Sequence, residues 1–77
     1  MFKTKYLSPT LNFGSRMKAT YKDKSVTVSY DYNLTEEENH YAVAKVFADK
    51  YELKDVFGIY INGSEMIWGR IREKLHI

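Results

Sequence analysis

The chain has 77 residues, carries a net charge of +2 and contains no cysteine, so disulfides and thiolate metal sites are excluded. A domain of this size needs large side chains for its core, and 7 tyrosines, 4 phenylalanines and 1 tryptophan supply them. No apolar run approaches the roughly 20 residues of a membrane span, and no signal peptide is recognisable, so we expect residues 1–77 to form a single cytoplasmic domain.

The charges are distributed unevenly along the chain. Residues 1–24 hold six basic side chains and one acidic one, whereas residues 25–53 hold two basic and six acidic ones. The net charges of these segments are therefore +5 and −4, with +1 for residues 54–77. We expect a dipolar molecule with a basic sheet and an acidic helix; the alternative is an ordinary mixed surface.

Residues 1–15 are interpreted as an arm or loop. Turn-forming residues interrupt this segment at Ser8, Pro9, Asn12 and Gly14, and a proline restricts both its own backbone and that of the residue before it. The segment leaves room for one additional short strand at Lys3–Leu7.

Residues 16–32 alternate between apolar and polar side chains, which predicts an antiparallel hairpin with a turn at Asp23–Lys24. In the first strand the inner side holds Met17, Ala19 and Tyr21, and the outer side holds Arg16, Lys18, Thr20 and Lys22. In the second strand the inner side holds Val26, Val28, Tyr30 and Tyr32, and the outer side holds Ser25, Thr27, Ser29 and Asp31. The solvated face is therefore predicted to be a cationic strip beside a hydroxyl-rich strip.

Residues 35–53 are predicted to form the helix. Thr35 and Glu38 have the spacing of a capping box, and the run Glu36–Glu38 suits the positive end of the helix dipole. The helical period places Val43, Val46 and Phe47 at the centre of the buried stripe, flanked by His40, Lys50 and Tyr51, with Ala44 at its border. The residues expected off that stripe are Tyr41, Lys45, Ala48, Asp49 and Glu52.

Residues 57–71 are predicted to form a second hairpin around Asn62-Gly63, a pair that favours a tight turn. A two-residue loop would pair Ile59 with Met66, and a four-residue loop would pair Ile59 with Trp68. Both registers place the same five residues on the core face: Phe57, Ile59, Ile61, Met66 and Trp68. Tyr60 and Ile67 then fall on the other face, and residues 72–77 are expected to be a polar tail.

Together these elements predict an α+β fold in which a four-stranded antiparallel sheet, in the order β-β-α-β-β, carries one helix packed on one face. An extra short N-terminal strand would enlarge the sheet. In either case the helix leaves the opposite face of the sheet open.

The chain shows no pattern typical of catalysis or of metal binding. His40 and His76 are far apart in the sequence, and a histidine beside an apolar helix face is typical of a structural residue. The three glutamates at the start of the helix are explained by capping. There is no nucleophile elbow, Walker loop or dinucleotide fingerprint. We therefore expect a protein that is not an enzyme and that uses no cofactor or metal.

The open face of the sheet and the N-terminal arm are the predicted working surface. Its candidate partner-binding residues are Lys3, Lys5, Tyr6, Arg16, Lys18, Tyr21 and Lys22, with Glu36 and Glu37 as a secondary acidic contact. A protein partner would suit this surface, because exposed tyrosine and arginine are common in interface hot spots. A nucleic acid would also suit it, with lysines on phosphates and an aromatic ring under a base.

One part of the chain resembles a known family of small proteins carried by bacterial plasmids, prophages and phages. The family pattern is KYxGPT…GSRIKA…YDxxL…ENHxxA. The matching segments here are residues 5–10 (KYLSPT), 14–19 (GSRMKA), 30–34 (YDYNL) and 38–44 (ENHYAVA), within about residues 3–50. Ser8 stands where the family usually has glycine, and Phe13 where arginine is common. The resemblance implies a mobile-element accessory protein.

The opening segment is also similar to phage anti-CRISPR proteins that bind the Cas7 backbone of the type I-F surveillance complex. The matching residues are 5–8 (KYLS), Leu11-Asn12 and Ala19–Tyr21. This resemblance implies a small α+β domain that contacts its target through Tyr6 and Tyr21, although the periodicity places Tyr21 on the core side of its strand.

The two resemblances lead to one hypothesis. The protein would be a non-enzymatic, anti-CRISPR-like inhibitor in the cytoplasm of an infected or lysogenic bacterium. It would bind a type I CRISPR effector complex, at a Cas7-like backbone or a DNA-binding subunit, and sterically block DNA binding or nuclease recruitment. The alternative is a small nucleic-acid-binding module that uses the basic sheet face.

Overall fold

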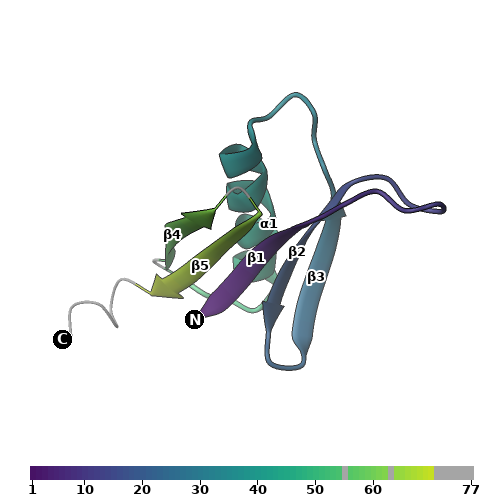
Figure 1. Ribbon diagram of the computed structural model, residues 1–77. Helices are drawn as coiled ribbons and strands as arrows, with labels where there is room; N and C mark the ends of the chain where they lie inside the picture. Colours follow the sequence, from purple (N-terminus) through teal and green to yellow (C-terminus); the bar gives the residue numbers. More distant parts are fainter. Residues whose placement is uncertain (55, 63, 71–77) are drawn as a thin grey trace.

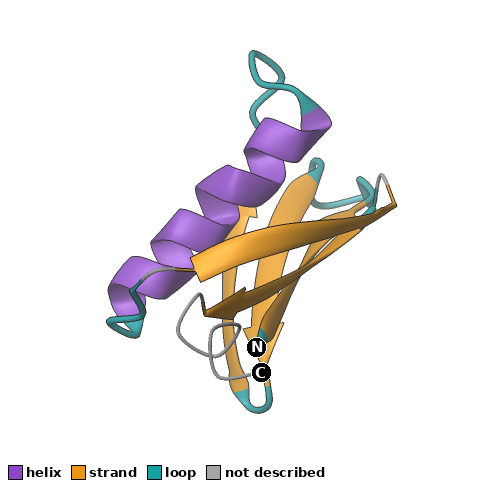
Figure 2. Cartoon of the chain, turned by 90° about the vertical axis from the view of Figure 1, so that its left-hand side faces the viewer, coloured by secondary structure: helices purple, strands orange, loops and turns teal. Residues whose placement is uncertain are grey.

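The computed structural model describes residues 1–54, 56–62 and 64–70. Its elements are β1 (Phe2–Leu7), β2 (Arg16–Tyr21), β3 (Lys24–Ser29), α1 (Glu36–Lys50), β4 (Val56–Asn62) and β5 (Glu65–Arg70). The five strands form one antiparallel sheet in the order β3-β2-β1-β5-β4, and α1 packs across one face of it (Figures 1 and 2). The predicted α+β class is confirmed, but the sheet has five strands rather than four.

The additional strand, β1, lies at the centre of the sheet. It pairs with β2 on one side and with β5 on the other, so Thr4 lies between Ala19 and Met66. The interpretation of residues 1–15 as an arm or loop is therefore wrong for residues 2–7, where the structure has the additional short strand that was left open at Lys3–Leu7. Local turn formers begin only at Ser8, and the β5 strand that fixes β1 lies some sixty residues later in the chain.

The start of α1 is formed as predicted by a capping box. The Thr35 hydroxyl accepts a hydrogen bond from the Glu38 amide at 3.1 Å, and the Glu38 carboxylate accepts one from the Thr35 amide at 2.8 Å. Asn39, which was not predicted to have a role, joins this end to the connection that follows β3. The buried side-chain oxygen of Asn39 accepts a hydrogen bond from the backbone N–H of Asp31 at 2.8 Å, and its side-chain nitrogen donates one to the Asp31 backbone carbonyl at 2.9 Å.

The helix ends at Lys50, earlier than the predicted Leu53, because the backbone turns left-handed at Glu52 (φ 57°). The Leu53 amide donates to the Ala48 carbonyl at 2.8 Å and the Glu52 amide to the Asp49 carbonyl at 3.4 Å. This is the Schellman pattern of helix termination, with glutamate where glycine is usual.

The buried stripe of α1 is rotated from the predicted one. The buried residues are Asn39, His40, Val43, Ala44, Phe47 and Ala48, whereas Val46 is 43% exposed and Lys50 is exposed. Placing Val46 inside and Ala48 outside was therefore wrong. The small side chains of Ala44 and Ala48 let the helix lie close to the sheet, and Asn39 and His40 can be buried because hydrogen bonds satisfy them.

The β4–β5 hairpin has neither predicted register, because β4 contains an irregularity between Tyr60 and Asn62. One extra residue in β4 turns the side chains that precede it to the opposite face of the sheet from the one predicted. Ile59 therefore pairs with Ile67, and Gly58 pairs with Trp68. Phe57, Ile59 and Ile61 are therefore not on the core face, and Ile59 is 58% exposed. Met66 and Trp68 are buried and Ile67 lies on the other face, as predicted. The Tyr60 side chain and residues 71–77, including His76, lie outside the described residues.

The absence of a side chain at Gly58 explains how Trp68 can lie on the buried face of the hairpin. A Cβ atom at residue 58 would lie 2.8 Å from the Met66 methyl group and 2.9 Å from two carbons of the Trp68 ring. The indole therefore lies over the strand where no side chain stands. This close approach fixes the register more firmly than the turn sequence does.

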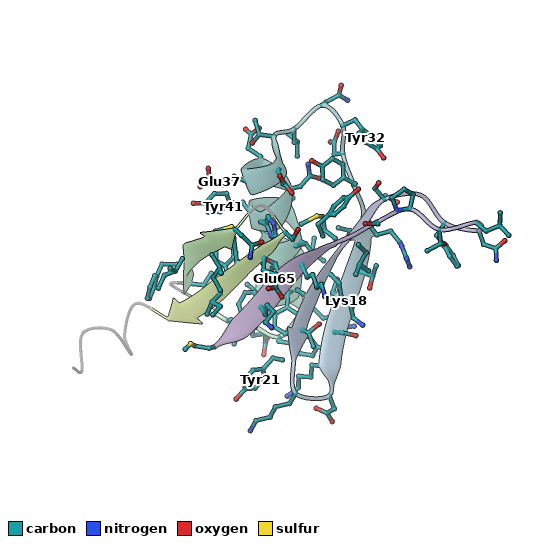
Figure 3. All side chains as sticks on the ribbon, viewed as in Figure 1. Lys18, Tyr21, Tyr32, Glu37, Tyr41 and Glu65 are labelled. Atoms are coloured by element: carbon teal, nitrogen blue, oxygen red, sulfur yellow. The ribbon has the colours of Figure 1, made fainter. Side chains whose placement is uncertain are left out.

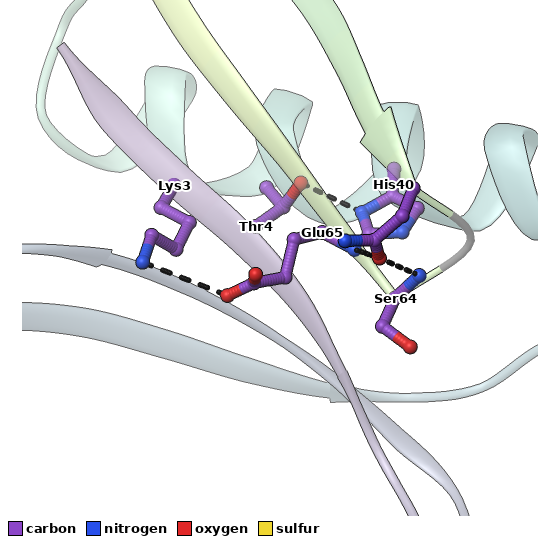
Figure 4. Close-up of polar contacts among 6 residues, drawn as sticks. Lys3, Thr4, His40, Ser64 and Glu65 are labelled. Atoms are coloured by element: carbon purple, nitrogen blue, oxygen red, sulfur yellow. Dashed lines mark hydrogen bonds and ion pairs between the residues drawn. The ribbon is translucent and has the colours of Figure 1, made fainter.

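The core holds a buried polar network among its aromatic side chains. The Trp68 indole N–H donates to the Thr4 hydroxyl oxygen at 2.9 Å, and that oxygen lies 2.7 Å from Nδ1 of the fully buried His40 (Figure 4). Because a buried hydroxyl proton without an acceptor is costly, we assign Thr4 as the donor to Nδ1. The prediction of a structural His40 is confirmed.

Candidate binding surface

The face of the sheet opposite α1 carries a group of cations on β1 and β2. Because side chains alternate along a strand, burial of Phe2, Thr4, Met17 and Ala19 against the helix turns their neighbours outward. We call the outward set Lys3, Lys5, Arg16 and Lys18 the cationic face. On the adjacent β3, Ser29 pairs with Arg16 and Thr27 with Lys18. The predicted cationic strip beside a hydroxyl-rich strip is confirmed.

The register places two like charges side by side at the centre of this face. Lys5 lies directly opposite Lys18 across the β1–β2 pair. Such directly opposed side chains are about 5 Å apart at Cβ, and a like-charged pair destabilises a sheet by roughly 0.2–1 kcal/mol. The fold therefore carries a local electrostatic cost that an anionic partner would remove.

Few carboxylates neutralise the cationic face. Lys3 forms an ion pair with Glu65 of β5 at 3.5 Å, with the lysine 54% exposed (Figure 4). Within residues 1–54, 56–62 and 64–70, no carboxylate forms an ion pair with Lys5, Arg16 or Lys18. In this same part of the chain the buried Nε atom of Arg16 has no hydrogen-bond partner. Three positive charges are thus available to an incoming group.

A projecting loop, residues 8–15, extends from the end of this face (Figure 1). It carries exposed apolar side chains. Leu11 is 99% exposed and Phe13 is 59% exposed. A local turn holds the tip, with the Thr10 amide donating to the Phe13 carbonyl at 2.7 Å. The Arg16 guanidinium carbon lies 4.9 Å from the centre of the Phe13 ring, so the loop and the cationic face are in contact. Neither Leu11 nor Phe13 is among the predicted binding residues.

The two tyrosines of the predicted surface lie on the helix side of the sheet instead. Tyr6 is partly buried, its hydroxyl is 2.9 Å from that of Ser15, and its ring meets the Tyr30 ring edge-on at 5.4 Å. Tyr21 is 38% exposed at the end of the β2–β3 hairpin (Figure 3). The Lys22 ammonium lies 5.3 Å from its ring. Of the seven predicted basic and aromatic residues, these three are therefore separate from the cationic face.

The predicted acidic contact is also separate from that face. Glu36 and Glu37 occupy the first turn of α1, in the other layer of the molecule (Figure 3). Partial burial raises the pKa of the Tyr30 phenol above its ordinary value, and the nearby Glu36 carboxylate raises it further. Glu36 therefore influences the Tyr30 phenol, whose ring contacts those of Tyr6 and Tyr32, and not the cationic face.

The part of the open face formed by β4 is apolar. Ile59 and Ile61 are 58% and 50% exposed, and Ile59 lies across from the outward-facing Ile67 of β5. The sequence placed these isoleucines in the core, and only the bulge in β4 brings them outside. The open face therefore combines cations, hydroxyls and exposed apolar groups.

Two further properties of the structure bear on other kinds of site. Within residues 1–54, 56–62 and 64–70, no three His, Cys, Asp or Glu side chains are grouped closely enough to hold a metal ion. In the same residues, no helix has the length and hydropathy needed to span a membrane.

No protein-family model, curated protein sequence or solved structure matches the chain.

Proposed function

We propose that this protein is a non-enzymatic binding protein that docks on an acidic protein surface. The observation that carries the proposal is the row of unneutralised cations, Lys5, Arg16 and Lys18, next to the exposed Leu11 and Phe13 of the projecting loop. An apolar anchor beside a charged rim is the usual composition of a protein interface. The charges would orient the encounter and the loop would supply buried area.

A protein partner fits this surface better than bare nucleic acid does. Single-stranded nucleic acid is bound by stacking bases on aromatic rings that lie among cations. The described outward residues of β1, β2 and β3 are charged, hydroxylated or aliphatic, and the tyrosines point toward the helix side. Phosphates could reach the lysines, but bases would find no ring among the strand residues, and the exposed Phe13 lies at the end of the face beside Arg16.

The specific form of the proposal is an anti-CRISPR-like inhibitor of a type I CRISPR effector complex. Its support is the resemblance of residues 5–8 and 11–12 to such inhibitors, together with the mobile-element family pattern. The protein would act in the cytoplasm of the infected or lysogenic bacterium. It would cover a Cas7-like or DNA-binding subunit and block DNA binding or nuclease recruitment.

Gel filtration of the protein with purified type I effector complexes tests this proposal, alongside plaque assays in bacteria with CRISPR immunity. We expect co-elution and protection of phage. Lys18→Glu should abolish both effects, whereas Lys45→Glu makes the same charge change on the exposed helix surface and should leave both intact. Absence of co-elution with every type I complex, or equal effects of the two variants, would reject the proposal.

The opposition of Lys5 and Lys18 supports a second candidate, direct binding to nucleic-acid phosphates. Neutralising about three phosphates would give a logarithmic salt slope near −3 on duplex DNA. Mobility shifts of naked DNA and RNA at low salt distinguish the two functions. A steep salt dependence favours this second candidate, and no shift at all removes it.

A further inference from the structure

A cavity unrelated to the cationic face lies where α1 ends over the sheet. Its volume is about 290 Å³, close to the lower limit of small-molecule sites. It opens at the end of the molecule where Tyr21 lies in Figure 3. Its lining includes Phe2, Tyr21, Lys24, Phe47, Tyr51 and Trp68.

Aromatic rings in consecutive contact form the wall of this cavity. The Trp68 ring is stacked on the Phe2 ring, with 6.0 Å between the ring centres. The distance between ring centres is 4.6 Å for Phe2 and Phe47 and 4.8 Å for Phe47 and Tyr51. Phe2, Phe47 and Trp68 are each at most 5% exposed and belong to the main core. The wall is therefore held by core packing, which prevents the rings from collapsing into the space they border.

Positive charge gathers at the mouth of the cavity. Lys24 lies on the helix side of β3, and its ammonium is 5.6 Å from the centre of the Tyr51 ring. The Lys50 ammonium is 5.5 Å from the same ring. Across the described residues, neither lysine forms an ion pair with a carboxylate. An apolar interior with the unneutralised Lys24 ammonium in its lining, and the Lys50 ammonium near the Tyr51 ring, is complementary to an amphipathic anion.

We propose that this cavity binds a small amphipathic carboxylate, with its hydrocarbon body against the Phe2–Phe47–Tyr51–Trp68 wall and its carboxylate at Lys24. A cationic ligand is disfavoured because the partly buried Tyr51 ring of the lining already faces two ammonium groups. The site uses none of the residues of the cationic face, so it is independent of the proposed docking function.

Trp68 provides a direct test, because it lines the cavity and is the single tryptophan of the chain. Decanoate is titrated below its aggregation concentration while the intensity of Trp68 emission is followed, and amide NMR shifts of residues 24, 51 and 68 give a second measurement. We expect saturable one-site binding with an optimum in chain length across the series from hexanoate to dodecanoate. Decylammonium, which has the same body and the opposite charge, should bind more than tenfold more weakly.

Matched variants separate this site from the docking surface. Lys24→Gln should weaken decanoate binding by about tenfold, as expected for loss of one charge-assisted contact, while Lys18→Gln should leave it unchanged. Binding to phosphatidylglycerol vesicles is measured in parallel, because it shows whether the protein recognises a free carboxylate or the anionic surface of a membrane. The proposal is overturned by no saturable change in either measurement, by equal binding of decylammonium, by an unaffected Lys24→Gln variant, or by binding to vesicles alone.

Discussion

Thr4→Val tests the buried network that joins the centre of the sheet to α1. Valine keeps the shape of threonine but removes the oxygen that contacts both Trp68 and His40, at 2.9 and 2.7 Å. The indole N–H and the imidazole Nδ1 would then be buried without this partner, in a position where Thr4 has no exposed surface. The substitution should therefore destabilise the fold strongly although it adds apolar surface.

The size of the effect follows from the two groups that lose their partner. Each buried polar group left unsatisfied costs about 1–3 kcal/mol, so we expect a loss of about 2–6 kcal/mol. A domain of this length has a total stability of roughly 4–12 kcal/mol. At about 4–8 °C per kcal/mol, the midpoint of thermal unfolding should fall by roughly 10–50 °C.

Urea unfolding followed by circular dichroism and by Trp68 fluorescence measures this loss. Thr4→Ser is the matched control: it keeps the hydroxyl and removes only a methyl group, with an expected loss of about 1 kcal/mol. If Thr4→Val proved as stable as Thr4→Ser, the hydroxyl would not be bridging the tryptophan and the histidine, and the assignment of the network would be wrong.

Four further substitutions test other parts of the structure, each by urea unfolding. Lys18→Glu should raise stability by about 0.5–1 kcal/mol at low salt, because it replaces the like-charged pair with Lys5 by an opposite-charged one; a loss of stability would contradict the register. Thr35→Ala should cost about 1 kcal/mol through loss of the cap, and Thr35→Ser should restore it. Gly58→Ala should cost about 1–3 kcal/mol because its Cβ overlaps Trp68, whereas Gly14→Ala, with no atom within 4 Å, should be neutral or slightly stabilising. Glu52→Gly should stabilise by about 0.5–1 kcal/mol by relieving the left-handed backbone, and no gain would mean that this helix end is unstrained.

Features set by neighbouring residues could be predicted from the sequence. The capping box depends on Thr35 and Glu38 alone, and the hairpin of β2 and β3 depends on an alternation that is visible within residues 16–29. Arg16 and Lys18 of the cationic face followed from the same alternation, whereas Lys3 and Lys5 join it through the pairing of β1 with β2. Burial of Met66 and Trp68 was also correct, because they lie two residues apart in a strand without a bulge and so share one face.

Features set by residues far apart in the sequence could not be predicted in this way. The central position of β1 depends on its pairing with β5, and no local signal announces that partner. The bulge in β4 follows from the fit of Trp68 over Gly58, so a one-residue shift reversed the predicted faces of Phe57 and Ile59. Hydrophobicity alone favoured Val46 over Ala48, although close packing of the helix required the smaller residue.

The central position of β1 also has a consequence for how the chain folds. The hairpins β2–β3 and β4–β5 and the helix join residues that are near in sequence, so each can form early. The β1–β5 ladder, by contrast, joins Phe2 to Trp68 and closes a loop that spans most of the chain. Until it closes, the two halves of the sheet are separate hairpins with unpaired inner edges. Formation of this ladder should therefore limit the folding rate, and the species that precedes it should be the one most prone to aggregate.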